Sequence, residues 1–381
     1  MGGAEISVQL LAEGLVKLGH KVFVVTTGAI NSVQKLNGVI IIRVKQHNIY
    51  SSFFDKTRSP LLKTVWHILD SHNFFFFRKI SRLLKKIKPD IVHTNNIQGF
   101  SPIVWKAVKK ANIPLVHTLR DYYLLCHKTL LFKNGSCCES LCADCRITNS
   151  IKKSQMLLPD CYVGISDFIL EKHGEFNSIH GRKKVVYNAV AGKKSTFNLV
   201  ESEKITFGYI GRIAADKGVE FLVKELAAVK KEYRSKFKVL FAGKGDSFYI
   251  NYLTELLEGI DHEFLGVVKP DEFYSRINLA IVPSLWYEPF GRIVIESLAA
   301  AVPVCGAQIG GIKELHNEDC MWAFKPEAGQ LFPLLQQIIE KPEQIHHKKL
   351  RAVSYASRFS EEVYLKNYLD IYNEVAPGET R

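Results

Sequence analysis

The sequence lacks any uninterrupted run of about 18 to 20 apolar residues, which a membrane-spanning helix requires. Its N-terminal stretch also lacks the apolar core of a secretory signal peptide, because Glu5, Gln9 and Glu13 interrupt it. We find no recognisable nucleic-acid-binding module, no internal repeat, and no low-complexity tract beyond the phenylalanines at 74–77. These absences predict a cytoplasmic protein.

What is present is the composition of a folded protein with an excess of positive charge. Of 381 residues, 47% are hydrophobic and 23% are charged, which fits two domains of ordinary size. The net charge is +13, from 51 Lys and Arg against 38 Asp and Glu. Such an excess favours an anionic partner, and we expect phosphates or acidic lipid rather than nucleic acid. A nucleic-acid binder stays open as an alternative that rests on charge alone.

One stretch combines a strand, a loop and a helix with two glutamates. The short apolar run Leu279–Val282 predicts a buried parallel strand, and the apolar spacing after it predicts a helix that begins near Phe290, with Pro289 at its entrance. Glu288 then lies on the loop, and Glu296 lies almost two turns into the helix. Two carboxylates so far apart can grip different parts of one elongated ligand, and free N–H groups at the helix start suit a phosphate.

This stretch resembles the Glu-x7-Glu signature of glycosyltransferase family 4, the retaining nucleotide-sugar transferases with two Rossmann-like domains (the GT-B fold). The resemblance implies that Glu288 approaches the donor sugar and that Glu296 hydrogen-bonds the ribose. It also assigns the residues between them, Pro289, Phe290 and Gly291, to the donor site. The alternative is a plain strand–loop–helix unit with surface glutamates.

A second pattern opens the C-terminal half of the chain. The predicted strand at 205–210 is followed by Gly211-Arg212, and Lys217-Gly218 then opens a helix. The pair resembles the family's Gly-Arg…Lys-Gly motif, which implies that Arg212 and Lys217 clamp the donor diphosphate as its bond to the sugar breaks. A surface Arg and Lys at a turn is the alternative. Gly243, in a glycine turn after the strand at 238–242, is a further donor-binding candidate.

The N-terminal end shows a glycine pair and a gap. Gly2 and Gly3 open a helix that precedes a strand at 21–26, and they resemble the family's loop beside the donor phosphates. The family has a strand before this pair, and the sequence shows none. We therefore expect the first strand of the domain to be missing between the strands at 21–26 and 91–95, through a start placed too late or a truncated, impaired copy.

Candidates for the acceptor or sugar side follow two strands of the first domain. Asn95 ends the strand at 91–95, while Arg120 and Asp121 follow the strand at 114–119. In the resembling subgroup a His that contacts the donor sugar stands where this chain has Arg120. An Arg at that position suits a phosphate or an acidic sugar instead.

Cysteines are concentrated between 126 and 145. The Cys-x2-Cys spacing is typical of a metal knuckle, and we predict a structural zinc site, because a reducing cytoplasm disfavours a disulfide. The predicted ligands are Cys126, Cys138, Cys142 and Cys145, with Cys137 as an alternative to Cys138. Free thiols or redox chemistry stay open as alternatives.

The segment from Pro60 to Lys88 is helical in pattern, with an apolar face beside a basic one. Such a helix suits an anionic membrane surface. A helix packed on a sheet, with its basic face in solvent, explains the pattern equally well.

Together these patterns predict an α/β protein of the GT-B type, with two Rossmann-like domains whose parallel sheets face a central cleft. We expect domains at 1–196, with a Cys-rich loop at 121–150, and at 197–360, and a C-terminal helix at 361–381 that crosses back to the first domain. The resemblance implies a retaining transferase that moves a sugar from a nucleoside-diphosphate sugar to a glycan, lipid-linked or small-molecule acceptor, with no cofactor needed for the chemistry. A nucleotide-sugar epimerase and a catalytically impaired binding protein are the alternatives.

Overall fold

The computed structural model describes residues 2–51, 53, 58–176, 179–190 and 204–376. The chain divides into two compact units. The first comprises residues 1–131, 138–189 and 361–381, and the second comprises 132–137 and 190–360. The predicted boundary at 196 lies outside the described residues. The short hairpin β6 (Phe132–Lys133) and β7 (Ser136–Cys137), expected within the first domain, groups with the second unit.

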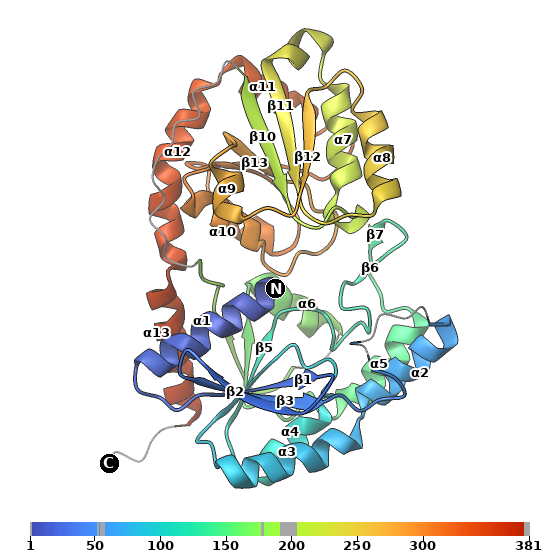
Figure 1. Ribbon diagram of the computed structural model, residues 1–381, viewed down its shortest axis with the longest axis vertical. Helices are drawn as coiled ribbons and strands as arrows, with labels where there is room; N and C mark the ends of the chain where they lie inside the picture. The colour runs from blue at the N-terminus through green and yellow to red at the C-terminus, as the bar shows by residue number, and fades with distance from the viewer. Residues whose placement is uncertain (1, 52, 54–57, 177–178, 191–203, 377–381) are drawn as a thin grey trace. The chain divides into compact units, whose positions relative to one another are not determined.

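The second unit is a six-stranded parallel sheet with helices on both faces, which confirms the predicted architecture (Figure 1). Its strand order is β12-β11-β10-β13-β14-β15. The strands are β10 (Ile205–Ile210), β11 (Phe237–Ala242), β12 (His262–Gly266), β13 (Leu279–Val282), β14 (Val304–Ala307) and β15 (Met321–Phe324). The helices are α7 (Val219–Ala228), α8 (Ser247–Leu256), α9 (Pro270–Tyr274), α10 (Arg292–Ala299), α11 (Phe332–Glu340) and α12 (Glu343–Ala356).

One core holds this sheet to four of its helices. Buried side chains of α7, α8, α11 and α12 pack against residues of β10, β11, β13, β14 and β15. Every residue of β13 is buried, as the unbroken apolar run Leu279–Val282 predicts for an inner parallel strand. The loops that leave the carboxyl ends of these strands are therefore carried by a rigid layer.

The first unit contains two sheets in place of one. A three-stranded sheet has the order β1-β3-β2, with β2 antiparallel, and a four-stranded parallel sheet has the order β4-β5-β8-β9. The strands are β1 (Phe23–Gly28), β2 (Ser32–Leu36), β3 (Val39–Lys45), β4 (Val92–Asn95), β5 (Leu115–Leu119), β8 (Cys161–Gly164) and β9 (Arg182–Val185). Among the described residues no ladder joins β1 to β4.

Helices cover the first unit, and one of them comes from the far end of the sequence. They are α1 (Gly3–Lys17), α2 (Pro60–Ser71), α3 (Phe74–Ile87), α4 (Ile103–Lys110), α5 (Ala143–Lys153), α6 (Asp167–Phe176) and α13 (Glu361–Val375). In α13, Tyr364, Tyr368 and Ile371 are buried in a core shared with α1, β5 and β8. The tyrosine spacing along the C-terminal helix therefore marks a face that packs on the first unit.

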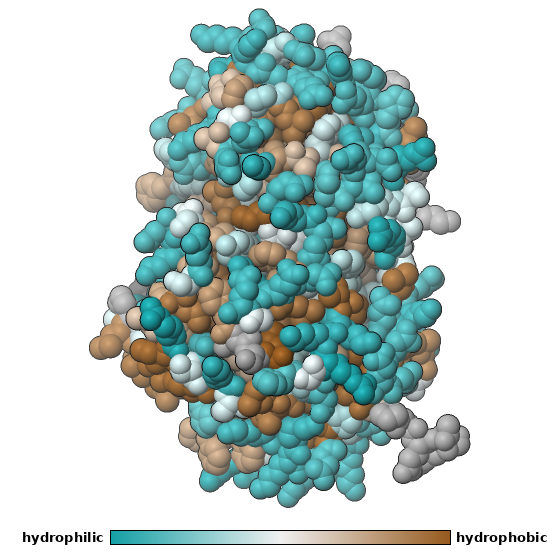
Figure 2. Space-filling model, turned by 180° about the vertical axis from the view of Figure 1, so that it is seen from behind, coloured by the Kyte–Doolittle hydropathy of each residue, from teal (hydrophilic) through white to brown (hydrophobic). Residues whose placement is uncertain are grey.

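The segment expected to be helical from 60 to 88 forms two helices that expose different surfaces. Phe76 and Leu84 of α3 are buried, so this helix packs on the domain with its basic face outward. In α2 the exposed residues Leu61, Val65 and Leu69 follow one another at four-residue spacing. Figure 2 shows hydrophobic side chains at the surface of this unit. None of the described helices is long and apolar enough to cross a membrane.

Two glycines bring the loops after β13 and β14 into direct contact. Gly310, in the left-handed region at φ +58°, and Gly311 begin the 3-10 helix η3 (Gly310–Leu315). A Cβ on Gly310 would lie 2.4 Å from the backbone oxygen of Glu288, and the Gly311 N–H donates to that oxygen at 2.7 Å. A side chain at this position would therefore displace the loop that carries Glu288.

We expect Gly310→Ala to lower the free energy of unfolding by about 1 to 3 kcal/mol more than Gly329→Ala, the cost of overpacking a close contact. Gly329 is a matched control because its φ is also positive, at +80°, while the nearest atom to a Cβ there is 3.9 Å away. Urea denaturation of the two variants measures the difference. Equal losses would show that backbone strain, and not the contact with Glu288, makes Gly310 necessary.

Candidate active site

Glu288 is held by three donors on one carboxylate oxygen. Its Oε2 accepts hydrogen bonds from Lys217 Nζ at 2.8 Å, Trp286 Nε1 at 2.7 Å and Ser284 Oγ at 3.3 Å. The side chains of Lys217 and Glu288 are 23% and 18% exposed, so the pair is shielded from water but still reachable. The two residues that the sequence assigned to one site therefore meet, although 71 positions separate them.

Lys217 lies at the end of a short turn that its neighbours fix. It closes the 3-10 helix η1 (Ala215–Lys217), and Gly218 follows at φ +72°. A Cβ on Gly218 would lie 1.8 Å from the Pro283 oxygen, so only glycine lets η1 approach the loop after β13. The Lys217 ammonium also lies 4.6 Å from the centre of the Trp286 ring, in a cation–π contact.

Arg212 lies near the same turn with a partner of its own. Its Nη2 donates to Asp216 Oδ2 at 2.6 Å, while the Arg212 side chain is 55% exposed and the Asp216 side chain only 10%. The buried carboxylate thus anchors one side of the guanidinium and leaves much of it open to solvent. The Arg212 carbonyl accepts a hydrogen bond from Tyr209 Oη at 2.7 Å, which fixes the backbone of the turn.

The carboxyl ends of β10 and β11 touch through two glycines. Gly243 has φ +141°, and a Cβ there would lie 1.7 Å from the Gly211 oxygen. The Gly211 N–H donates to the Ala242 oxygen at 2.9 Å. Both predicted glycines therefore leave backbone exposed at the edge of the sheet where Arg212 begins, as a close approach of ligand to backbone requires.

The helix that carries Glu296 begins later than the sequence suggested. It starts at Arg292, because Gly291 before it takes φ +98° and breaks the helical path, so Pro289 is not at the helix entrance. Glu296 consequently lies little more than one turn into α10, where it pairs with Arg292. Phe290 is buried against Phe359 and shapes the loop from within.

The start of α10 has no side-chain cap. The first N–H groups of a helix have no partner within it, and the helix dipole adds positive potential there. With Lys217 and Arg212 in the same unit, the second unit presents cations, glycine backbone and a helix start around two anchored glutamates. This set suits a ligand with a diphosphate and hydroxyl-bearing groups at either end.

In the first unit Arg120 is buried in a network of neutral partners. Its Nε donates to Asn95 Oδ1 at 2.7 Å, its Nη1 to Asn188 Oδ1 at 2.7 Å and its Nη2 to Tyr364 Oη at 2.9 Å. Ser7 Oγ also donates to Asn188 Oδ1, at 3.0 Å. The guanidinium therefore ties α1, the end of β4 and α13 together. These bonds use three of the five guanidinium N–H groups, and the contact with a phosphate or an acidic sugar stays a prediction.

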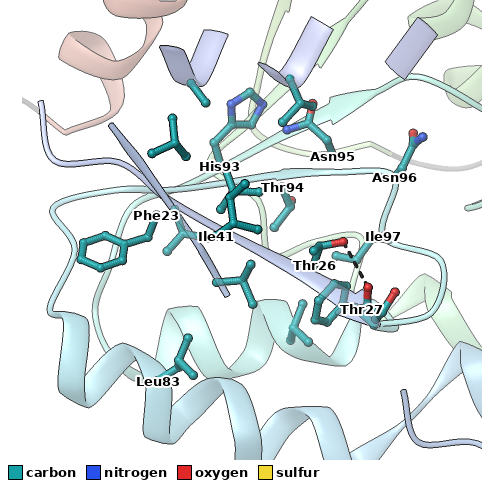
Figure 3. A pocket seen from close by; sticks show the side chains of 18 of the residues that line it. Phe23, Thr26, Thr27, Ile41, Leu83, His93, Thr94, Asn95, Asn96 and Ile97 are labelled. Atoms are coloured by element: carbon teal, nitrogen blue, oxygen red, sulfur yellow. Dashed lines mark hydrogen bonds between the residues drawn. The ribbon is translucent and has the colours of Figure 1, made fainter. Parts of the chain in front are cut away.

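Of the other first-unit candidates, Gly3 contacts this network through its carbonyl, which lies 3.0 Å from Ser7 Oγ. The Asp121 carboxylate accepts the Tyr123 N–H at 2.9 Å, and burial raises the pKa of Asp121 to about 6. Gly2 precedes α1 in extended backbone conformation, and Gly3 is the first residue of the helix. Close to Asn95 (Figure 3), His93 hydrogen-bonds Tyr372 and Thr118, and burial lowers the pKa of His93 well below its ordinary value.

Three of the four predicted zinc ligands come together as thiols. A hydrogen bond with Cys145 lowers the pKa of Cys126, while the same bond raises the pKa of Cys145, which also contacts Cys142. All eight cysteines are free. Within the described part of the chain, however, no group of three or more His, Cys, Asp and Glu side chains has an arrangement that could hold a metal ion. The structural zinc site therefore stays a prediction.

Several residues of these networks were absent from the sequence analysis. Asp216 lies four positions after Arg212, the spacing of a helical ion pair, which is a signal that the sequence does contain. Trp286 lies between Ser284 and Glu288, where its indole N–H had no visible partner in the sequence. For Asn188 there is no local signal, because the residue it binds, Arg120, is 68 positions away.

Three curated relatives align with this chain over most of their length. An uncharacterized 42.6 kDa protein in the cps region of Klebsiella pneumoniae is 36% identical over 83% of this chain and 83% of its own. An uncharacterized glycosyltransferase of Methanocaldococcus jannaschii is 26% identical over 85% and 82%. An alpha-monoglucosyldiacylglycerol synthase of Acholeplasma laidlawii is 23% identical over 98% and 95%.

Solved structures and family profiles cover both units. Sucrose-phosphate synthase of Thermosynechococcus elongatus superposes with a TM-score of 0.78 at 19% identity over 98% of this chain and 93% of its own. Anabaena HepE in complex with UDP-glucose gives 0.67 at 16% over 98% and 96%. The profile described as Glycosyltransferase Family 4 matches residues 1–191, and that of Glycosyl transferases group 1 matches 192–358. The chain therefore belongs to glycosyltransferase family 4, has the GT-B fold and is an enzyme of the transferase class.

Proposed function

We propose that this glycosyltransferase moves a sugar, with retention of its anomeric configuration, from a nucleoside-diphosphate sugar to an acceptor hydroxyl in the synthesis of a surface polysaccharide or glycolipid. The observation that carries the proposal is the ion pair between Lys217 and Glu288, 2.8 Å long, in the unit that also holds Arg212 and a helix, α10, whose start has no side-chain cap. The donor diphosphate lies against these cations. Glu288 faces the donor sugar, and Glu296 holds the ribose.

Lys217 and Arg212 act on the leaving group. As the bond between the sugar C1 and the diphosphate oxygen breaks, negative charge grows on the diphosphate. Two positioned cations stabilise that charge more than they stabilise the bound donor, which is what lowers the barrier. Asp216 and Glu288 keep the two cations in place before the donor binds.

Three hydrogen bonds to Oε2 reduce the nucleophilicity of the Glu288 carboxylate. This supports a step on one face of the sugar, without a covalent intermediate on the protein. The bond from C1 to the diphosphate oxygen breaks, the acceptor oxygen bonds to C1 on the same face, and the acceptor proton passes to an oxygen of the leaving phosphate. No metal takes part in this step.

The acceptor class follows from the relatives. One lies in a capsule (cps) gene region and another is named as a glycolipid synthase, which favours a glycan or a lipid-linked acceptor over a small molecule. We assign the acceptor to the first unit, where Asn95 ends β4 and Asp121 follows β5 by two residues.

A lipid-linked acceptor lies at a membrane, so attachment of the first unit to the membrane surface would bring the enzyme to it. The exposed residues Leu61, Val65 and Leu69 of α2 form an apolar stripe, and the next helix, α3, carries a basic face. Apolar side chains beside Lys and Arg are the features by which proteins lie on anionic bilayers. We therefore propose a cytoplasmic enzyme that binds the membrane surface peripherally.

Lys217→Ala should lower the turnover of sugar transfer by roughly two to three orders of magnitude, as the loss of one transition-state charge donor does. UDP-, GDP- and ADP-sugars are first screened for thermal stabilisation of the protein to find the donor. Product formation from that donor and a glycan or lipid acceptor is then measured. Lys224→Ala is the control, since Lys224 also pairs with a glutamate, Glu220, but on the exposed face of α7.

Each alternative function gives a distinct result in the same assay. An epimerase converts the donor to a new sugar nucleotide without an acceptor, and a binding protein is stabilised by nucleotide but forms no product. Either result would replace the proposal. If Lys217→Ala retained more than about half of the activity, its assignment to the diphosphate would be wrong.

Glu296→Gln should weaken the binding of the free nucleotide by about 1 to 3 kcal/mol, the range for a hydrogen bond to a charged group. The fold should persist, because an i,i+4 ion pair such as Arg292–Glu296 contributes only about 0.3 to 0.5 kcal/mol. Titration calorimetry measures the affinity. Glu220→Gln removes a similar i,i+4 pair from α7 and should leave binding unchanged. Unchanged affinity in Glu296→Gln would assign this glutamate to another task.

The triple variant Leu61→Ser, Val65→Ser and Leu69→Ser should reduce co-flotation with phosphatidylglycerol vesicles, because it removes the apolar stripe while leaving the charge intact. The parent protein should not float with phosphatidylcholine vesicles, which lack the anionic headgroup. Val267→Ser, at an exposed apolar residue of the second unit, serves as the control. If the triple variant and the parent protein floated equally, the apolar stripe of α2 would not contribute to membrane binding.

A further inference from the structure

A short hairpin from the Cys-rich loop groups with the unit that holds the candidate active site. Residues up to 131 and from 138 to 189 belong to the first unit, while Phe132–Cys137 belongs to the second. Among the described residues before 190, this segment alone joins the unit of Lys217 and Glu288. That unit therefore receives an element from the half of the sequence that otherwise builds the first unit.

The turn of this hairpin gives it a defined shape. Asn134 and Gly135 join its two strands, with φ +53° and +80°, and a type I′ turn requires positive φ at both of these positions. Cys137 ends β7, and beyond it the Cys138 N–H donates to the Leu131 oxygen at 2.7 Å. Because a hairpin of two strands is only marginally stable by itself, its position depends on the contacts that it makes with the rest of the unit.

The hairpin contacts the loop after β13 through its last residue. The Cys137 thiol donates a hydrogen bond to the Leu285 oxygen, with 3.3 Å between Sγ and the oxygen. Cys137 is half-buried, so this bond forms where water is partly excluded. A thiol is a weak donor, and the importance of the bond therefore depends on what the Leu285 backbone connects.

The Leu285 backbone is held by two different elements. Its N–H donates to the Asp216 oxygen at 3.1 Å, and Asp216 lies in η1, the turn that ends at Lys217. Its carbonyl accepts the bond from Cys137. A Cβ on Gly218 would lie 3.3 Å from Leu285 Cγ, so the turn and the loop are in close contact here. The loop is therefore fixed both by the turn of Lys217 and by the hairpin.

The residues on either side of Leu285 both contact Glu288. Ser284 Oγ and Trp286 Nε1 donate to its Oε2, at 3.3 Å and 2.7 Å. The Leu285 carbonyl and the Trp286 N–H belong to one planar peptide group, so a bond to that carbonyl fixes the plane from which Trp286 continues. Loss of the bond would let this plane rotate and would change the contact between the indole and Glu288.

We propose that Cys137 is a positioning residue for sugar transfer: through the Leu285 carbonyl it holds the loop that places the Trp286 indole and the Glu288 carboxylate. The hairpin β6–β7 thereby supports the candidate active site. For its effect on turnover the inference rests on the function proposed for Lys217 and Glu288. Its effect on the loop does not, because the loop can be observed without any substrate.

The test measures the environment of Trp286 and the turnover in matched variants. Protein labelled with 5-fluorotryptophan gives a fluorine NMR signal for each of its four tryptophans, and Trp286→Phe identifies the signal of Trp286. We expect Cys137→Ala to shift or broaden this signal alone. With the donor found in the thermal screen, Cys137→Ala should also lower turnover roughly two- to tenfold, the effect of one lost hydrogen bond.

Two further variants separate the hydrogen bond from other tasks of the thiol. Cys137→Ser keeps a donor for the Leu285 oxygen and should restore both the signal and the turnover. Ser136→Ala removes the neighbouring hydroxyl, which donates to the Lys133 oxygen within the hairpin, and should change neither. The three other tryptophan signals should stay in place in each of these variants, which shows that the chain is folded.

Three results would overturn the proposal. An unchanged Trp286 signal in Cys137→Ala would show that the thiol does not hold the loop. If Cys137→Ser behaved like Cys137→Ala, the thiol would have another task, such as metal binding. A changed signal with unchanged turnover would exclude a role in transfer, and this result is distinct from a failure of the proposed function, which Lys217→Ala tests.

Discussion

Backbone hydrogen bonding between parallel strands is the constraint on which both units depend. A buried N–H or C=O without a partner costs about 1 to 3 kcal/mol, so each inner strand needs a neighbour on both sides. The second unit meets this condition over six strands and holds its ligand-facing loops on a single rigid sheet. In the first unit, β1 and β4 belong to separate sheets, and no ladder of hydrogen bonds joins them among the described residues. The candidate site is therefore best defined in the unit whose ladders are continuous.

Within the second unit, one carboxylate organises the loops from two directions. The oxygen Oε2 of Glu288 collects Lys217 from η1 and the indole of Trp286 from its own loop. The backbone of Glu288 is in turn held by Gly311, in the loop after β14. Glu288 thus fixes both the position of the Lys217 ammonium and the contact between the loops after β13 and β14. These groups are therefore held in place in the absence of a ligand.

Several candidate residues of this site could be placed from local spacing in the sequence. Contacts between residues far apart in the sequence could not be predicted. Arg212 and Lys217, like Glu288 and Glu296, are each fixed within one strand–loop–helix unit, so their positions followed from the pattern. The helix after Gly291 began two residues later than expected, since the sequence did not reveal that this glycine has φ +98°. The setting of Arg120 was not predictable, because its partners Asn188 and Tyr364 lie 68 and 244 positions away.

The return of α13 to the first unit has a consequence for biosynthesis. Tyr364 and Tyr368 complete the core around β5 and α1, yet residues 190–360 must be translated before they emerge. At about 5 to 20 residues per second, the ribosome needs roughly 10 to 30 seconds for that interval. During it the nascent first unit exposes the surface that α13 will cover. Its native state is therefore reached only near the end of synthesis, and the second unit, contiguous apart from one short hairpin, can fold as it emerges.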